Sequence, residues 1–444
     1  MTNLPEEFIL QTRQLMGEER FNRYLGAFEE EAPVSIRVNP KMHRGTVPKH
    51  RGTVPCVSSA ADNTGTVPSV QVPSVQKVPW CPEGYYLSER PQFTFDPLFH
   101  AGCYYVQEAS SMFITHILRS IIGNLSPLTS HLSPLNILDL CAAPGGKSTA
   151  AISVLPEGST MISNEPIPNR AQILLENITK WGYPNCTVTN NYPRDFRKAK
   201  AKFDIIICDV PCSGEGMFRK DPATIGEWSM QNVEKCWRLQ REIVADAWEC
   251  LNPGGILIYS TCTFNTKENE ENVRYFMEEF DAEILDIPTE PSWNITGSLL
   301  EGFDAPVYRF IPGITRGEGL FICALRKSEQ HRGTVPCVSK ERQRLNNTGT
   351  VPSVLRQLTP DLPDGDFPTS DLSYPEALKY LRGEAIVLPP DTPKGIVTVT
   401  YQGFALGPAK NIGNRANNLY PKPWRIKTTH LPTEAPKVIE GLKN

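Results

Sequence analysis

Two cysteines, Cys212 and Cys262, each follow an apolar stretch of the kind that forms buried strands. An acidic residue, Asp209, lies just before the first of them. A cysteine thiolate can form a covalent bond with an electron-poor carbon, and a carboxylate can hold the molecule that it attacks. One cysteine at a strand end is more often a core residue than a nucleophile. Two cysteines and an aspartate at neighbouring strand ends instead favour covalent catalysis.

One reaction that needs such a combination is methylation of carbon 5 of cytosine. This carbon is a poor nucleophile, but addition of a thiolate at carbon 6 turns the ring into an enamine, whose carbon 5 can attack an electrophilic methyl group. An aspartate can hold the base edge and favour protonation of the ring nitrogen. The thiol must first ionise from a pKa of ~8.5, and a helix N-terminus or a nearby cation assists this.

A loop of small residues, 139–148 (Asp-Leu-Cys-Ala-Ala-Pro-Gly-Gly-Lys-Ser), follows another apolar strand. Its paired glycines let a ligand approach the backbone beside a helix N-terminus. A phosphate-binding P-loop would need a glycine where Cys141 stands, and the dinucleotide spacing Gly-x-Gly-x-x-Gly is absent. A cofactor built from an adenosine and an amino-acid tail remains as the ligand, and a plain tight turn is the alternative.

Apolar strands alternate with helical patterns between residues 99 and 327, which predicts a parallel sheet covered by helices on both faces. We expect strands at 137–140, 160–163, 187–189, 205–208 and 255–259, and helices at 169–181 and 233–251. Ligands bind at the carboxyl ends of such strands, so both cysteines should lie at that edge. Glu165, at the end of the second strand, could accept hydrogen bonds from ribose hydroxyls, although a solvated helix-start residue is the alternative.

The composition is that of a globular protein with two or three domains: of 444 residues, 40% are hydrophobic and 21% charged. No apolar run approaches the roughly 18 residues of a membrane span, and the acidic N-terminus lacks a signal-peptide pattern. We therefore expect a soluble, cytoplasmic protein. Its 12 cysteines include no Cys-x-x-Cys pair, so we expect no metal site.

Gly-Thr-Val-Pro recurs at Gly45, Gly52, Gly65, Gly333 and Gly349, in two blocks that are too far apart to form a solenoid. Proline and glycine in every copy predict flexible insertions. Around these blocks we expect an N-terminal RNA-binding α+β domain at 1–98, with an insertion at 43–78 and an acidic helix at 6–31. A catalytic domain at 99–327, a flexible linker at 328–357 and a C-terminal RNA-binding domain at 358–444 follow.

The net charge of −4 argues against a general polycation, but the C-terminal segment is basic. Residues 401–444 contain seven Lys and Arg and two Glu, an excess of five positive charges. The cations Arg415, Lys422, Arg425 and Lys427 alternate with Tyr420 and Trp424, a pattern that suits phosphate contacts with base stacking. A solvated basic surface is the alternative.

Segments 139–148, 209–216 and 260–263 resemble the signature motifs of the Sun-type (NSUN/RsmB/RsmF) RNA cytosine-C5 methyltransferases. Supporting segments are Ser35-Ile36-Arg37-Val38-Asn39-Pro40, Tyr105 to Met112 and Arg316 to Phe321, and 380–384 and 403–407 resemble the C-terminal domain of the RsmF type. The resemblance implies a class I methyltransferase sheet (Rossmann-like) with an N-terminal RNA-binding α+β domain and a small PUA-like C-terminal domain. It also implies S-adenosyl-L-methionine as the cofactor.

Transferred residue by residue, the resemblance makes Cys262 the nucleophile, Cys212 a helper in product release and Asp209 a catalytic residue. It also implies cofactor contacts by Cys141, Ala142, Ala143, Pro144, Gly145, Gly146, Lys147, Glu165, Arg170, Asn191 and Asp209. Many family members have an aspartate where Asn191 stands. The adenine contact therefore falls to Asn191 or, as a weaker candidate, to Asp195.

The expected activity is thus methyl transfer from S-adenosyl-L-methionine to carbon 5 of a cytosine in RNA, through a covalent adduct between cysteine and C6. The resemblance favours 16S ribosomal RNA, or the ribosomal subunit that contains it, as the partner. The alternatives are methylation of tRNA and a non-catalytic RNA-binding assembly factor with the same fold. We expect a monomer with no membrane partner.

Overall fold

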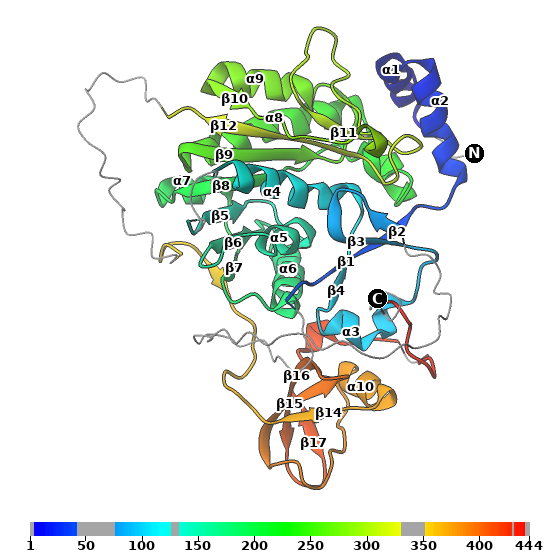
Figure 1. Ribbon diagram of the computed structural model, residues 1–444, viewed down its shortest axis with the longest axis vertical. Helices are drawn as coiled ribbons and strands as arrows, with labels where there is room; N and C mark the ends of the chain where they lie inside the picture. The colour runs from blue at the N-terminus through cyan, green and yellow to red at the C-terminus, as the bar shows by residue number, and fades with distance from the viewer. Residues whose placement is uncertain (1–3, 42–75, 126–132, 330–350, 429, 440–444) are drawn as a thin grey trace, which may run out of the picture.

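The computed structural model describes residues 4–41, 76–125, 133–329, 351–428 and 430–439. Three sheets lie along the chain: a small N-terminal sheet, a large central sheet and a small C-terminal sheet. Along the long axis of the molecule, helices α1 (Glu6–Met16) and α2 (Glu18–Gly26) lie near one end and the C-terminal sheet forms the other (Figure 1). Within these ranges no helix is both long and apolar enough to cross a bilayer.

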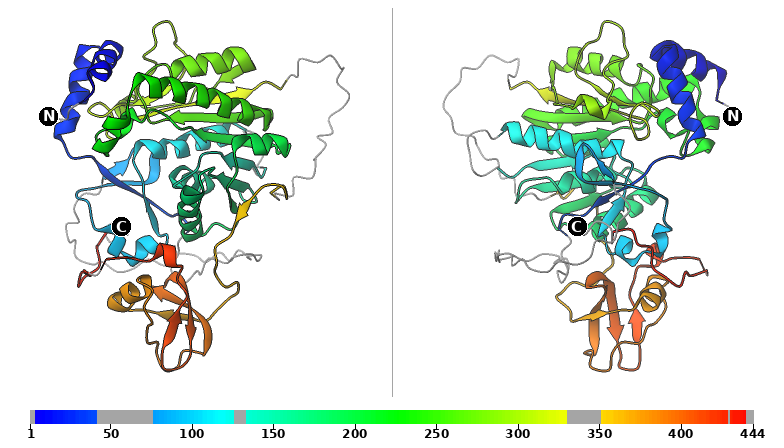
Figure 2. Two further views of the ribbon diagram at one scale, coloured as in Figure 1. Left: turned by 180° about the vertical axis from the view of Figure 1, so that it is seen from behind. Right: turned by 45° about the vertical axis from the view of Figure 1, so that its right-hand side comes forward.

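The expected single helix at 6–31 is wrong, because Gly17 interrupts it. Gly17 has φ 75° and ψ 164°, a conformation that favours glycine and cannot continue a helix. The chain therefore forms α1 and α2, followed by the 3₁₀ helix η1 (Ala27–Glu29). Phe8, Phe21 and Tyr24 from these helices pack with Phe218 and Phe264, so the helices cover the loops that follow two central strands. Figure 2 shows from two further sides where α1 and α2 lie beside the central part of the molecule.

The N-terminal sheet has the strand order β2-β3-β1-β4, and its neighbouring strands are antiparallel. Its strands are β1 (Val34–Val38), β2 (Gln76–Val78), β3 (Cys81–Leu87) and β4 (Tyr104–Val106). β1 coincides with the strand-like segment in the sequence. β2 begins within the expected insertion, and β4 lies beyond the expected domain boundary at residue 98. The short helices η2 (Phe93–Phe95) and α3 (Pro97–His100) connect β3 to β4.

The central sheet has the order β10-β12-β9-β8-β5-β6-β7-β13, with β11 paired to β12. Its five middle strands are parallel, as expected: β5 (Asn136–Asp139), β6 (Thr160–Asn164), β7 (Cys186–Thr189), β8 (Phe203–Asp209) and β9 (Leu251–Thr261). Its antiparallel edge strands were not anticipated: β10 (Ala282–Ile284), β11 (Tyr308–Phe310), β12 (Leu320–Lys327) and β13 (Gln357–Leu358).

Alternate side chains of these strands enter separate cores on the two faces of the central sheet. Ile205, Ile207 and Ile258 pack on one face with α4 (Phe113–Leu125) and α5 (Gly146–Ile152). Ile206 and Leu257 pack on the other face, with α7 (Pro193–Lys198), α8 (Met230–Glu249) and α9 (Glu270–Phe280). The other helix between strands of this sheet is α6 (Pro168–Trp181). Short 3₁₀ helices are η3 (Ser110–Met112), η4 (Glu215–Met217), η5 (Pro222–Glu227) and η6 (Pro291–Trp293). Burial on both faces explains why the strands read as nearly continuous apolar runs.

The C-terminal unit is a four-stranded sheet with the order β14-β15-β16-β17 and one helix. Its elements are β14 (Thr369–Asp371), α10 (Tyr374–Leu381), β15 (Gly395–Tyr401), β16 (Phe404–Asn411), β17 (Ala416–Asn418) and η7 (Lys422–Trp424). Its core is continuous with the core beneath the N-terminal sheet, where Ile36, Leu98 and Tyr104 are buried. The C-terminal unit is therefore packed against the rest of the protein.

This packing contradicts the expectation that Tyr420 stacks on RNA bases. Tyr420 is buried, and its hydroxyl lies 3.4 Å from Nδ1 of His100 in α3. Arg425 donates two hydrogen bonds to the carbonyl of Tyr420, and Lys180 of α6 lies over the ring of Trp424. Tyr420 and Trp424 thus lie where the C-terminal unit meets α3 and α6, while Arg425 holds the backbone of its own unit.

The repeat blocks, predicted to be flexible insertions, lie almost wholly outside the described residues. Where the second block ends, however, the chain is packed on the central sheet. Leu355 is buried in the core of that sheet, and β13 pairs with β7 within and just after the expected linker 328–357.

The buried guanidinium of Arg37 joins β1 to the helix that follows the glycine-rich loop. Its Nε donates to Oε1 of Gln107 at 2.7 Å, and its Nη2 donates to Oγ1 of Thr149 at 2.6 Å. The guanidinium also stacks over Trp181, 4.5 Å from the ring centroid. Burial lowers the pKa of Arg37 to about 10, which leaves it charged at neutral pH.

We predict that Arg37→Ala strongly destabilises the protein, because it removes the buried donor to Oε1 of Gln107, breaks the contact with Oγ1 of Thr149 and leaves a cavity beside Trp181. The loss should be about 3 kcal/mol, seen as a fall of several degrees in the midpoint of thermal unfolding. Arg238→Ala is the control: this side chain is 72% exposed in its ion pair with Glu234, so its loss should cost less than about 1 kcal/mol. Equal effects of the two variants would contradict the conclusion that Arg37 stabilises the contact between β1 and α5.

Candidate functional site

A cavity of about 180 Å³ lies at the carboxyl ends of β5 and β8, where the sequence placed the ligand. Side chains from the glycine-rich loop, the strand ends and the β4–α4 connection line it: Tyr105, Val106, Gln107, Glu108, Ser111, Asp139, Cys141, Ala142, Ala143, Pro144, Gly146, Lys147, Asp209 and Lys220. Most of the loop residues named from the sequence therefore line one cavity. The residues around the β4–α4 connection belong to the segment Tyr105 to Met112, which supported the family resemblance but supplied no predicted site residue, and Lys220 lies just beyond the motif 209–216.

The glycine-rich loop has a backbone shape that only its small residues allow. The peptide bond between Ala143 and Pro144 is cis, and Gly145 has φ 113° at the start of α5. A Cβ on Gly145 would also meet the side chain of Leu174 at 3.2 Å. Arg170 donates to the carbonyl of Ala143 at 3.0 Å, so α6 supports the loop from outside. Arg170, a predicted cofactor contact, thus reaches the loop backbone.

Lys147 and Asp209 form an ion pair inside the cavity, with 2.9 Å between Nζ and Oδ2. The second carboxylate oxygen of Asp209 accepts a hydrogen bond from Ser260 at 2.7 Å, which joins the ends of β8 and β9. Burial tends to lower the pKa of Lys147, but the charge of Asp209, with a contribution from Cys262, raises it above its ordinary value. Lys147 therefore stays a cation close to Cys262.

Asp139, at the end of β5, is a buried carboxylate that the sequence reasoning left out of the site. Its Oδ2 accepts a hydrogen bond of 2.6 Å from Ser148, while Oδ1 has no hydrogen-bond partner among the described residues. Burial raises the pKa of Asp139 to about 7, against the opposing effect of the Ser148 hydroxyl. An oxygen left free in a cavity wall can accept a hydrogen bond from a ligand.

Glu165 lies at the end of β6 and is 1% exposed. Its Oε1 accepts a hydrogen bond from the amide of Ile167 at 3.0 Å. Its Oε2 lies 3.6 Å from Arg170 and, within the described residues, accepts no hydrogen bond. This carboxylate is thus not the solvated helix-start residue that the sequence left open, and it keeps an acceptor free for a ligand.

The two candidates for an adenine contact are both engaged in holding the backbone. The side-chain amide of Asn191 pairs with the backbone of Arg356: its Nδ2 donates at 3.1 Å and its Oδ1 accepts at 3.0 Å. Asp195 accepts the amide of Tyr192 at 2.9 Å and so caps α7. Asn191 keeps further hydrogen-bonding capacity. The choice between these two residues as the adenine contact stays a prediction.

Cys212 and Cys262 come together at the ends of β8 and β9, with 3.2 Å between their sulfur atoms. The amide of Cys262 also donates to the sulfur of Cys212 at 3.3 Å. The hydrogen bond to Cys262, together with burial, raises the pKa of Cys212 well above that of an ordinary thiol. Either sulfur can be the donor in this contact. Cys141 is a half-buried thiol of the cavity wall, and desolvation raises its pKa as well.

Buried polar side chains hold the two cysteine loops in place. The carboxylate of Glu215 accepts the amides of Phe264 and Asn265, at 2.7 and 2.9 Å. Asn269 accepts the hydroxyl of Thr261 at 2.6 Å and donates to the carbonyl of Thr263. Glu270 forms a buried ion pair with Arg309, which also donates to the carbonyl of Phe264. The cluster of acidic and amide residues shortly after each cysteine could have indicated from the sequence that these loops are held by side-chain hydrogen bonds.

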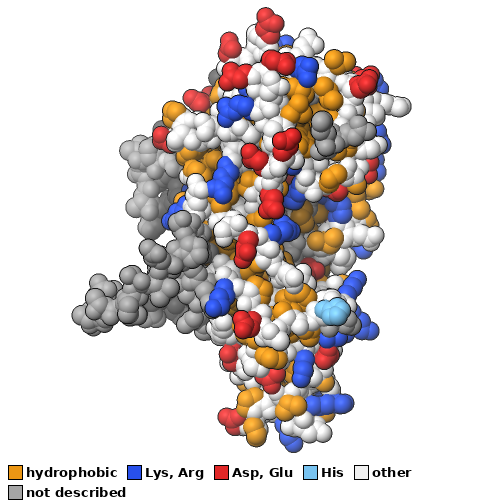
Figure 3. Space-filling view, turned by 90° about the vertical axis from the view of Figure 1, so that its right-hand side faces the viewer, with side chains coloured by type: hydrophobic (Ala, Val, Ile, Leu, Met, Phe, Trp, Pro, Cys, Tyr) orange, Lys and Arg blue, Asp and Glu red, His pale blue; other side chains and the backbone are white. Residues whose placement is uncertain are grey.

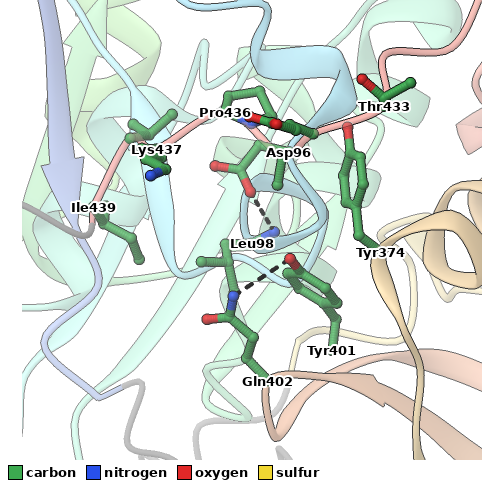
Figure 4. A pocket seen from close by; sticks show the side chains of 12 residues that line it. Asp96, Leu98, Tyr374, Tyr401, Gln402, Thr433, Pro436, Lys437 and Ile439 are labelled. Carbon is green, nitrogen blue, oxygen red and sulfur yellow. Dashed lines mark hydrogen bonds between the residues drawn. The ribbon is translucent and has the colours of Figure 1, made fainter.

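A larger cavity, of about 420 Å³, lies elsewhere, between α3, the β15–β16 turn and the C-terminal segment (Figure 4). Tyr374 and Tyr401 from the C-terminal unit face it, and Asp96 lies on its opposite side. Asp96 accepts the amide of Leu98 and the hydroxyl of Tyr104, so it caps α3. None of the residues singled out from the sequence lines this cavity.

In the described ranges, no three His, Cys, Asp or Glu side chains are grouped as metal ligands would be. The parallel middle of the central sheet, its antiparallel β12 beside β9 and the ligand loop after β5 define a class I methyltransferase fold. The adjoining pair of cysteines adds a site for covalent attack.

Matches to family models divide the chain in the same way. Residues 129–326 match the model of the 16S rRNA methyltransferase RsmB/F, residues 4–109 the N-terminal domain of 16S rRNA methyltransferase RsmF, and residues 367–426 the methyltransferase RsmF PUA domain. This chain belongs to the RsmB/F family of methyltransferases and is of the RsmF type, with both accompanying domains.

Relatives named ribosomal RNA small subunit methyltransferase F support this assignment. The protein of Escherichia fergusonii is 30% identical over 78% of this chain and 67% of its own length. That of Enterobacter sp. strain 638 is 26% identical over 94% of this chain and 95% of its own length. With the Cronobacter sakazakii protein the identity is 36%, but the match spans only about half of that relative, 51% of its length.

Solved structures confirm the fold. A methyltransferase homologue from Pyrococcus horikoshii matches with a TM-score of 0.55 and 24% identity, over 73% of this chain and 96% of that one. NSun6 from the same organism, crystallised with SFG, matches with a TM-score of 0.54 and 20% identity, over 74% of this chain and 100% of that one.

The residues of the cavity fit S-adenosyl-L-methionine, the cofactor of this class. Two buried carboxylates, Asp139 and Glu165, each keep an oxygen without a hydrogen-bond partner among the described residues. The cofactor carries donors for such oxygens in its ribose hydroxyls and its ammonium group. The loop of small residues between these carboxylates leaves its backbone open to close approach.

We predict that Asp139→Asn raises stability in a pH-dependent way. The unfolded aspartate ionises near pH 3.9, but in the folded protein burial raises its pKa to about 7. Keeping the charge buried therefore costs nothing below about pH 4, an increasing amount up to pH 7, and a constant amount above it, at most about 4 kcal/mol. The midpoint of thermal unfolding of the variant should exceed that of the wild type more at pH 8 than at pH 5. An equal gain at both values would show better packing instead.

Proposed function

We propose that this protein transfers a methyl group from S-adenosyl-L-methionine to carbon 5 of a cytosine in 16S ribosomal RNA. The observation that supports this best is the position of the two thiols, 3.2 Å apart, next to the Lys147–Asp209 pair at the cofactor cavity. A methyltransferase that acts on an already nucleophilic atom needs no cysteine at its cavity. A pair of cysteines suits a target carbon that must first be activated.

The cofactor would be held by the glycine-rich loop, by Asp139 and Glu165 through their free carboxylate oxygens, and by Arg170 through the loop. When bound, S-adenosyl-L-methionine supplies an electrophilic methyl group. Lys147 and Asp209 line the cavity, and Ser260 ties Asp209 to the strand that ends just before Cys262. The amide side chain of Asn191, or Asp195, would complete the adenine end of the site.

The thiolate of Cys262 forms a bond to C6 of the cytosine, and the electron pair of the C5–C6 double bond moves toward C5 while N3 takes up a proton. C5 then carries the nucleophilic electron pair that would bond to the methyl carbon, while the electron pair of the broken methyl–sulfur bond would stay on the cofactor's sulfur and S-adenosyl-homocysteine would leave. Afterwards C5 loses its proton to water, the C6–sulfur bond breaks with its electron pair returning to Cys262, and N3 releases its proton. The atoms and charges balance, and the enzyme regains its thiolate.

Three residues make these steps favourable. Lys147 remains a cation near Cys262 and so stabilises the thiolate before attack and after release. Asp209 can hold the edge of the base that gains the proton. Cys212 keeps its proton and donates to the sulfur of Cys262, which makes that sulfur a better leaving group. Of the two cysteines, Cys262 is thus the nucleophile and Cys212 the helper.

The cysteine roles predict opposite phenotypes for two alanine variants. Cys262→Ala cannot form the C6 bond, so it should be inactive while it still binds the cofactor. Cys212→Ala should still attack and methylate RNA but release it slowly, and a covalent protein–RNA complex should accumulate. Denaturing gel electrophoresis with labelled RNA measures that complex.

The double variant is the control, because the complex should vanish when Cys262 is also replaced. A complex formed by Cys262→Ala, and none by Cys212→Ala, would reverse the assignment. If the wild type itself transfers no methyl group to RNA, the chain would act as a non-catalytic RNA-binding assembly factor, and methylation unchanged in both single variants would remove the cysteines from the mechanism. Methylation of tRNA but not of 16S RNA would replace the proposed substrate.

The C-terminal unit carries exposed cations suited to the RNA backbone. Lys394, Lys410 and Arg415 surround the β16–β17 turn: Lys410 pairs with Ile396 across the sheet, and Lys394 lies beside Gly413. Figure 3 shows acidic and basic side chains mixed over most of one face and several basic ones at the end formed by this unit. This turn, and not the Tyr420–Trp424 segment, is our candidate for RNA contact.

Replacing Lys394, Lys410 and Arg415 together by Ala should weaken RNA binding without changing cofactor binding. The logarithm of the affinity decreases with the logarithm of the salt concentration, and each phosphate contact contributes about 0.7 to the steepness of this decrease. Loss of three contacts should therefore make the dependence shallower by about 2. Fluorescence anisotropy at several salt concentrations measures it. Replacing the exposed cations Arg197, Lys198 and Lys200 of the α7 region, by contrast, should alter the slope little. An unchanged slope in the first variant would exclude the turn.

A further inference from the structure

Cys212 and Cys262 carry the same thiol group and both follow the ends of central strands, yet only one of them can be the nucleophile. Their sulfur atoms lie 3.2 Å apart and both are half-buried. One proton shared between two such thiols can reside on either sulfur. Some group outside the pair must therefore hold it on Cys212.

A buried carboxylate on the Cys212 side is that of Glu268. Burial raises the pKa of Glu268 to about 7, so this group is mainly charged at pH 8. Its Oε2 accepts the amide of Ser213, the residue after Cys212, at 3.0 Å. The same oxygen accepts Nε2 of Gln240 at 2.7 Å, and that amide nitrogen also donates to the carbonyl of Pro211 at 2.9 Å. Glu268 thus fixes the backbone on both sides of Cys212, directly and through Gln240.

Glu268 also has an electrostatic effect on the thiol of Cys212. After the hydrogen bond to Cys262 and burial, the charges of Cys262 and Glu268 further raise the pKa of Cys212. A second negative charge next to a buried carboxylate is unfavourable, so a thiolate is disfavoured on Cys212. On the Cys262 side the nearby charge is instead the cation Lys147.

We propose that Glu268 is the positioning residue that selects Cys262 as the nucleophile, by fixing the Cys212 loop and disfavouring a negative charge on Cys212. This inference rests on the proposed function, in which the two cysteines have different roles. Glu268 touches neither base nor cofactor in this account. It acts through Cys212.

The control is a second buried carboxylate of the same loops. Glu215 is 2% exposed and accepts the amides of Phe264 and Asn265 and Nε1 of Trp228. It therefore supports the Cys262 loop, whereas the carboxylate whose charge raises the pKa of Cys212 is that of Glu268. Replacing Glu215 loosens the loops without removing the charge that acts on Cys212.

The experiment labels the full-length protein, without RNA, with a limiting amount of iodoacetamide at pH 8 and measures the alkylated fractions of Cys212 and Cys262 by peptide mass spectrometry. In the wild type, label should be mainly on Cys262. In Glu268→Gln the ratio of Cys212 to Cys262 label should rise about tenfold, as for a change of one unit in relative thiol pKa. Glu268→Asp, which keeps the charge, should restore most of the wild-type ratio.

Glu215→Gln should raise the labelling of both cysteines together and leave their ratio unchanged. A ratio that stays at the wild-type value in Glu268→Gln would overturn the proposal. So would an equal rise of the ratio in Glu215→Gln, because the effect would then be loop loosening. Calorimetric binding of S-adenosyl-homocysteine shows that each variant is folded.

Failure of the proposed function has a different signature. If the wild type is labelled mainly on Cys212, or if Cys262→Ala still methylates RNA, the assignment of the nucleophile is wrong whatever Glu268→Gln does. If Cys262 is confirmed by both tests and the ratio does not respond to Glu268, only the selection by Glu268 is wrong.

Discussion

The parallel pairing of β8 with β9 is the constraint on which the whole site depends. Its register sets Asp209 opposite Ser260, so the residues that follow the two strands emerge side by side. Cys212 and Cys262, fifty positions apart in sequence, then meet within 3.2 Å. A slip of one residue would turn the side chains of β9 to the opposite face. The apolar pattern of both strands prevents this slip, because each face has its own core.

Buried carboxylates form the second level of organisation around that pair. Glu215, Glu268 and Glu270 hold backbone amides or a buried guanidinium near the cysteines, and Asp139 and Glu165 end the two strands that face the cofactor. Each carboxylate away from water is costly unless it is hydrogen-bonded. Those of the cysteine loops are satisfied within the protein, whereas Asp139 in the cavity wall and Glu165 at the end of β6 each keep an oxygen without a hydrogen-bond partner among the described residues. The hydrogen-bonded carboxylates therefore stabilise the loops of the site, whereas the carboxylates with an unpartnered oxygen can bind a ligand.

The accompanying units are joined to the catalytic sheet by buried polar contacts and a shared core. Arg37 connects the N-terminal sheet with α5, and His100, Lys180 and Tyr420 meet where the C-terminal unit packs. The exposed cations of that unit are thereby fixed relative to the cavity. An RNA held at the β16–β17 turn would be presented to the site from a constant direction.

The sequence by itself determined the parallel strands, the class of the fold and the residues of the glycine-rich loop, because these signals are local: apolar runs, small residues and turns. It also identified both cysteines and Asp209 by their places after strands. It could not show the break at Gly17, the burial of Tyr420 or the antiparallel strands β10–β13, since each depends on what packs against it. The free oxygen of Asp139 and the action of Glu268 on Cys212 were likewise decided by tertiary structure. Burial and hydrogen-bond partners come from residues far apart in the chain, and they decide which carboxylate is satisfied, which is left for a ligand and which sulfur keeps its proton.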